Sequence, residues 1–136
     1  MTIARFLGIY GGTLVTFLAL DALWLGVVAR GFYARQLGEM LRDDPRWGAA
    51  VLFYLIYIAG VVVLAVLPAL EGRSPAKALG LGALLGLVAY GAYDLTNLAT
   101  LRGFPVRMVV VDLVWGTALT GVVAWAGYGV GRFLTG

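Results

Sequence analysis

The chain has 136 residues, of which 62% are hydrophobic and 12% are charged, and its net charge is +3 at pH 7. Soluble domains have about 45–50% apolar and about 25% charged residues, so a soluble core does not account for this composition. The basic residues are spread over loops and helix ends without forming a stripe, which argues against nucleic-acid binding. The absence of cysteine and histidine excludes disulfides, thiolate metal sites and the usual zinc ligands.

Four apolar segments are each long enough to cross a hydrocarbon layer of about 30 Å as a helix. They cover about residues 6–29, 48–70, 78–101 and 106–131. Helices are required because backbone groups in lipid must be hydrogen-bonded within their own segment. The sequence therefore predicts an all-α integral membrane protein, with a single transmembrane domain over residues 1–136 and four helices in an antiparallel bundle.

Charged residues, glycine and proline mark the connections between these helices. Arg30-Gly31 ends the first helix, a polar turn lies between Pro68 and Pro75, and Arg102-Gly-Phe-Pro105 joins the third helix to the fourth. The first connection is longer and amphipathic, which predicts an interfacial helix at about residues 32–43.

An internal repeat is visible when Asp21 is aligned with Asp94. Phe17 then coincides with Tyr90, and after a one-residue slip Arg30-Gly-Phe meets Arg102-Gly-Phe. This pattern is typical of a duplicated helical hairpin. Chance similarity is the alternative, because apolar helices often share residues at matching positions. Two such hairpins would be related by an axis along the membrane normal.

Three of the seven acidic residues, Asp21, Asp94 and Asp112, lie inside apolar helices. A charged side chain there costs about 2.5–3.5 kcal/mol, so their placement indicates a function. Each has an indole or amide donor three residues later, on the same helix face. These donors are Trp24, Asn97 and Trp115.

All three aspartates lie in the half of the bundle where the first and third helices end. At 1.5 Å per residue they are roughly 8–13 Å inside the membrane boundary, so we expect them to share one layer. No basic residue lies as deep, and we therefore expect at least one carboxyl group to be protonated at neutral pH. Tyrosine side chains reach the same layer. The predicted ligand- or proton-binding residues are Asp21, Trp24, Tyr54, Tyr57, Tyr90, Asp94, Asn97, Asp112 and Trp115.

A purely structural role is the alternative for these residues. Carboxyl groups also hydrogen-bond helices together, an interaction worth about 0.6 kcal/mol on average in membrane bundles. Tryptophans in membrane helices commonly serve in packing or in anchoring at the interface.

Three segments, Phe17–Gly26, Tyr90–Gly103 and Val111–Gly116, resemble the bacterial membrane protein family of unknown function DUF2177. The resemblance covers nearly the whole chain. It implies four helices in the bacterial inner membrane. It brings no established activity and therefore assigns no functional residue or cofactor.

Transport or permeation of protons, a cation or a small cationic or amphipathic ligand is the first functional hypothesis, with carboxylates and aromatic faces holding the ligand. In size and helix count the chain is similar to small multidrug transporters, which act as dimers, so a homodimer is expected under this hypothesis. An intramembrane enzyme that modifies lipids or isoprenoids, holding Mg²⁺ with two aspartates and Asn97, is one alternative. An accessory subunit that binds a lipid, a pigment or a membrane complex is the other. The lipid bilayer is a partner in every case.

Overall fold

The computed structural model describes residues 1–136, and it is entirely helical. Four helical segments are long and apolar enough to cross a membrane. They are Ile3–Val28, Trp47–Glu71, Pro75–Thr100 and Val106–Thr135. The predicted all-α architecture of four packed helices is thereby confirmed. The third segment begins at Pro75 instead of residue 78, and the fourth ends at Thr135 instead of residue 131.

The first segment consists of α1 (Ile3–Leu23) and a π-helical turn, η1 (Trp24–Val28). Thr2 caps its start, since its hydroxyl accepts a hydrogen bond from the backbone N–H of Arg5. The N–H of Ala29 closes the π turn on the carbonyl of Trp24 at 2.7 Å. A π turn inserts an extra residue between donor and acceptor, so it changes the direction of the side chains around it.

A short helical connection follows at the membrane boundary. Gly31, with φ of 77°, leads into α2 (Phe32–Leu37) and the 3₁₀ turn η2 (Gly38–Met40). The predicted interfacial helix over about residues 32–43 is therefore shorter in the structure. Gly38, with φ of 57°, ends its α-helical part.

The second segment consists of α3 (Trp47–Val61), the π turn η3 (Val62–Val66) and α4 (Leu67–Glu71). Pro68 lies inside this continuous segment, so the polar turn is confined to residues 72–74 and does not begin at Pro68. A proline inside a helix removes one i→i−4 hydrogen bond. The π turn ends at Val66, two residues before Pro68, and the N–H of Leu67 bonds to the carbonyl of Val62.

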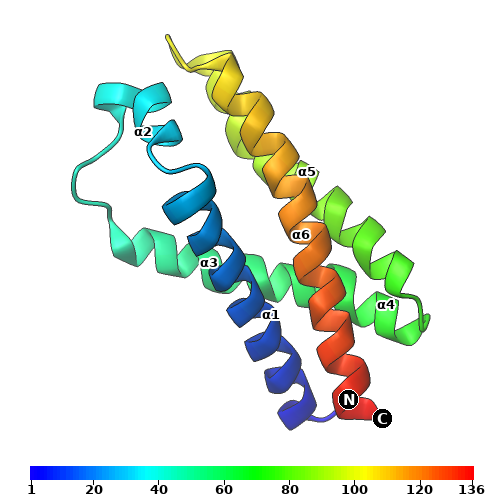
Figure 1. Cartoon of the computed structure of the whole chain (residues 1–136). Helices are drawn as coiled ribbons and strands as arrows, with labels where there is room; N and C mark the ends of the chain where they lie inside the picture. Colours follow the sequence, from blue (N-terminus) through cyan, green and yellow to red (C-terminus); the bar gives the residue numbers. More distant parts are fainter.

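The last two helices, α5 (Pro75–Thr100) and α6 (Val106–Thr135), form a close hairpin and lie side by side in Figure 1. Glycines permit the close approach. A Cβ atom added at Gly82 would lie 2.6 Å from the Cβ of Ala124, and one added at Gly86 would meet the carbonyl of Gly116.

The two halves of the bundle are packed differently. Near the chain termini, which lie together at one end of Figure 1, an apolar core that includes Ile58, Val62 and Val123 is fully buried. Toward its N-terminal end α3 diverges from α1 and α6. Leu52 and Ile56 on this part of α3 are about 60% exposed, and in a bilayer they face lipid.

Candidate ligand-binding cavity

A cavity of about 430 Å³ lies in the half of the bundle where α1 ends and α3 and α6 begin. Twelve residues line it, and eight of them are aromatic. The aromatic residues are Phe17, Trp24, Tyr33, Phe53, Tyr54, Tyr90, Tyr93 and Trp115. Two of the other four are acidic, Asp21 and Asp112, and no lysine or arginine lines the cavity.

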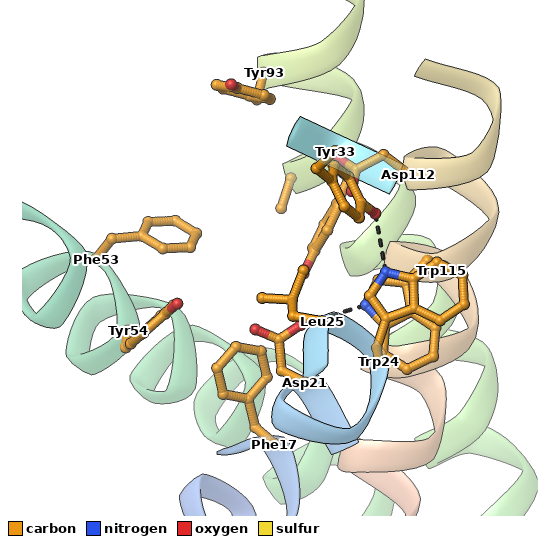
Figure 2. A pocket seen from close by; sticks show the side chains of 12 residues that line it. Phe17, Asp21, Trp24, Leu25, Tyr33, Phe53, Tyr54, Tyr93, Asp112 and Trp115 are labelled. Atoms are coloured by element: carbon orange, nitrogen blue, oxygen red, sulfur yellow. Dashed lines mark hydrogen bonds between the residues drawn. The ribbon is translucent and has the colours of Figure 1, made fainter. Parts of the chain in front are cut away.

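All four long segments and α2 contribute to the lining. On the first segment, Phe17, Asp21 and Trp24 follow at helical spacing and therefore share one face. Across the cavity, Figure 2 shows Phe53 and Tyr54 of α3 facing Asp21 and the tryptophans. The divergence of α3 keeps these two aromatic residues apart from α6 and thus leaves the space that the cavity occupies.

Trp24 and Trp115 form a stacked pair on one wall. Their rings are nearly parallel, with an interplanar angle of 8° and centroids 4.4 Å apart. One indole comes from η1 and the other from α6, so the stack joins the first and last segments. A stacked aromatic pair adds about 0.5–1.5 kcal/mol beyond its buried area, which makes this wall well defined.

The hydrogen bonds of the tryptophans cross between helices. The indole N–H of Trp115 donates to Oδ1 of Asp21 at 3.4 Å, and that of Trp24 donates to the hydroxyl of Tyr33 at 2.9 Å. Tyr33 in turn donates to Oδ1 of Asp112 at 2.9 Å. The prediction that each tryptophan serves the aspartate three residues before it is therefore wrong. Side chains at i and i+3 project together toward the neighbouring helix, so Trp115 reaches Asp21 of the first segment directly, and Trp24 is connected to Asp112 of α6 through the hydroxyl of Tyr33.

Tyr33 is a member of the site that the sequence did not single out. It lies on α2, outside the spanning segments, and links Trp24 to Asp112. Burial raises the pKa of its phenol, and the nearby Asp112 raises it further, although the hydrogen bond from Trp24 acts in the opposite direction. The hydroxyl therefore stays protonated and keeps donating. The amphipathic pattern of this connection was the available signal, but it predicted an interfacial helix and did not single out Tyr33.

The three intramembrane aspartates have different surroundings. Asp21 and Asp112 are half-buried and line the cavity. Asp94 is completely buried, lies outside the cavity lining, and has no hydrogen-bond partner at either carboxylate oxygen. The predicted pairing of Asp94 with Asn97 is thus absent. Asn97 lines a separate groove together with Arg42 and Arg46.

Tyr57 also lies outside the cavity. It is buried, shares a hydrogen bond with Thr120, and packs edge-on against Phe17 with the ring centroids 5.2 Å apart. Six of the nine predicted residues line the cavity, and their role in binding stays a prediction. These six are Asp21, Trp24, Tyr54, Tyr90, Asp112 and Trp115.

Comparison with known proteins supports the membrane assignment. The family model described as "Predicted membrane protein (DUF2177)" matches residues 6–129. The chain belongs to the DUF2177 family. This confirms the resemblance seen in the sequence and identifies an integral membrane protein. Comparisons with curated proteins and with solved structures gave no match. The DUF2177 description names no activity, so the function has to be argued from the cavity.

Proposed function

We propose that the protein binds a hydrophobic organic cation in this cavity and transports it across the bacterial inner membrane. The observation that carries the proposal is an aromatic enclosure with two carboxyl groups and no basic residue. Aromatic faces attract cations by about 0.5–2 kcal/mol each, most strongly where water is excluded. Carboxylates add a charge interaction that a low dielectric strengthens.

The size of the cavity favours an organic ligand over a bare metal ion. Pockets for drug-sized molecules span roughly 300–1,000 Å³, and the volume of about 430 Å³ lies in this range. A small hard cation needs several converging oxygen ligands, whereas eight of the twelve lining residues here are aromatic. The two acidic side chains would neutralise the ligand's charge while the rings contact its apolar groups.

The exposure of the lining residues indicates how a ligand could enter. Leu25, Phe53 and Tyr93 line the cavity and are also 48–56% exposed, so the cavity reaches the surface of the helix bundle. In a bilayer this opening faces lipid or the boundary region, where lipophilic cations accumulate. The buried core closes the other half of the bundle. Release on the opposite side would therefore require a rearrangement of the helices.

The alternative of a magnesium-dependent enzyme has less support from the geometry. No three acidic side chains converge in a way that could hold a metal ion. That hypothesis combines two aspartates with Asn97, but Asp94 is enclosed, Asp21 and Asp112 line the cavity, and Asn97 lines the separate groove.

Binding of tetraphenylphosphonium to the protein in lipid nanodiscs tests the proposal, with quenching of tryptophan fluorescence as the readout. We expect saturable binding, weakened about tenfold or more by Asp112→Asn, which corresponds to at least about 1.4 kcal/mol. Asp44→Asn is the matched control, because Asp44 is an exposed acid in the loop before α3. Tetraphenylborate has a similar size and the opposite charge, and it should not bind.

Equal binding of tetraphenylborate, or unchanged affinity in Asp112→Asn, would contradict a site for cations. The transport part needs a separate measurement. Proteoliposomes should accumulate tetraphenylphosphonium in response to an imposed gradient, and Asp112→Asn should abolish this uptake. Binding without any uptake above that of empty liposomes would contradict transport.

A further inference from the structure

We infer that Asp94 and Asp112 form a carboxyl pair that binds one proton, and that a cation entering the cavity displaces this proton. The first part depends only on the packing of α5 against α6. The second part rests on the proposed function.

The register of the two helices places the carboxyl groups opposite each other. A Cβ atom added at Gly116 would meet the ring of Tyr90, so these two residues are in direct contact across the interface. One turn further along α5 leads from Tyr90 to Asp94, and one turn back along α6 leads from Gly116 to Asp112. In an antiparallel pair both steps run in the same direction, so Asp94 and Asp112 lie opposite each other across the interface.

The surroundings of Asp94 disfavour an ionised pair. Asp94 has no exposed surface, and neither of its oxygens accepts a hydrogen bond. The other titratable groups near the two carboxyl groups are Asp21, Tyr33, Tyr90 and Tyr93. None of them can supply a positive charge, and Asp21 is a further acidic group. A negative charge on the fully buried Asp94 would repel one on the half-buried Asp112 opposite it, and no positive charge compensates them, so the pair retains one proton.

The hydrogen bonds indicate which residue carries the proton. Oδ1 of Asp112 accepts a hydrogen bond from Tyr33 at 2.9 Å, and this favours a negative charge on Asp112. Asp94 has no hydrogen-bond donor in reach that would stabilise a negative charge, so its carboxyl group carries the proton of the pair. Within the pair, the buried member is the acid and the cavity-lining member is the anion.

Cation binding then changes the charge balance of the pair. Asp112 lines the cavity, whereas Asp94 does not, so the ligand acts on the pair through Asp112. A positive charge beside Asp112 favours the doubly ionised form. The O–H bond of Asp94 breaks, and the proton leaves through Asp112 to the aqueous phase. One positive charge enters as one leaves, which keeps the net charge of the interior unchanged.

Infrared spectroscopy of the protein in liposomes tests the pair without any ligand. Wild type should show the carbonyl stretch of a protonated carboxyl group at neutral pH. Asp94→Asn should remove this band, and the neutral amide has nearly the same size and shape as the carboxyl group, which preserves the packing. Asp44→Asn is the control and should keep the band. A spectrum that Asp94→Asn leaves unchanged would overturn the pair.

Tetraphenylphosphonium added to the same samples tests the coupling. In wild type the band should disappear, and an indicator dye should report release of about one proton per bound cation. The release per bound cation should fall to near zero in Asp94→Asn. Binding with no loss of the band would overturn the coupling. If tetraphenylphosphonium does not bind at all, both the proposed function and the coupling are contradicted. The infrared band measured without ligand still shows whether the pair holds a proton.

Discussion

The indole rings of Trp24 and Trp115 are stacked at 4.4 Å between centroids, while their N–H groups serve different partners. Trp115 donates to Asp21, and Trp24 donates to Tyr33. The stack thus holds two sets of hydrogen bonds in place. One joins Trp115 to Asp21, and the other joins Trp24 through Tyr33 to Asp112, and both aspartates line the cavity. Packing of aromatic rings and placement of charge are achieved by the same two residues.

Stacked indoles couple their electronic transitions, so the pair should give an exciton couplet in circular dichroism. We expect Trp24→Phe and Trp115→Phe each to abolish the couplet, because either substitution removes one chromophore of the stack. Trp125→Phe is the control, since Trp125 is half exposed on α6 and lies outside the cavity lining. A couplet that persists in Trp24→Phe would show that the stack does not form in the membrane.

The hydroxyl of Tyr33 should contribute measurably to stability. Tyr33→Phe leaves the N–H of Trp24 without its acceptor and Asp112 without its donor. Both hydrogen bonds are partly buried, and a hydrogen bond to a charged group contributes about 1.5–3 kcal/mol. We expect a loss of this size in the free energy of unfolding, measured in mixed detergent micelles. Tyr128→Phe is the matched control, because Tyr128 lies in a separate cluster with Ala69 and Ala78. Equal effects of the two substitutions would contradict a specific role for Tyr33.

Tyr33 also predicts a dependence of stability on alkaline pH. Burial raises the pKa of its phenol above the ordinary value of about 10. The folded protein therefore holds this proton more tightly than the unfolded chain does. The contribution to stability is complete below about pH 10 and is lost as the pH rises above that value. Unfolding measured across this range should show a smaller decline in Tyr33→Phe than in wild type, and parallel declines would contradict the assignment.

The sequence predicted the helices well because the bilayer imposes a minimum length on every apolar segment. It also located the aspartates, since charge inside an apolar helix is costly and therefore conspicuous. It could not predict that Asp94 is enclosed while Asp112 lines a cavity. That difference depends on the rotation of α5 and α6 about their axes, and helices that are apolar on most sides do not specify a rotation.

The sequence also could not predict the role of Phe17 and Phe53 in the cavity or the hydrogen-bond partners of the two tryptophans. Phe17 and Phe53 resemble ordinary packing residues in an apolar helix, so nothing in the sequence separated them from the other aromatics. The crossed pairing of the tryptophans depends on contacts between helices that are distant in sequence. The π turn at Trp24 also contributes, because local spacing rules assume a regular α-helix.

The close packing of α5 on α6 should depend on Gly86. A Cβ atom at this position would meet the carbonyl of Gly116 and lie 2.6 Å from Oγ1 of Thr120. The backbone carbonyl cannot move aside without separating the helices, so Gly86→Ala should reduce stability by about 1–3 kcal/mol, as overpacking does elsewhere. Gly80→Ala is the control on the same helix, since a Cβ atom there has nothing within 4 Å. A helical glycine costs about 0.5–1 kcal/mol relative to alanine, so Gly80→Ala should be neutral or slightly stabilising.

The same interface connects packing to the cavity, because the ring of Tyr90 lies on Gly116 and also lines the cavity. Gly116→Ala should displace this ring and weaken tetraphenylphosphonium binding, in addition to lowering stability. Thermal unfolding in detergent and fluorescence titration together distinguish the two effects: Gly86→Ala should act mainly on unfolding, and Gly116→Ala on both. If Gly80→Ala and Gly86→Ala shift the unfolding temperature alike, the helices do not approach as closely as the glycines allow, and the register that places Asp94 opposite Asp112 loses its support.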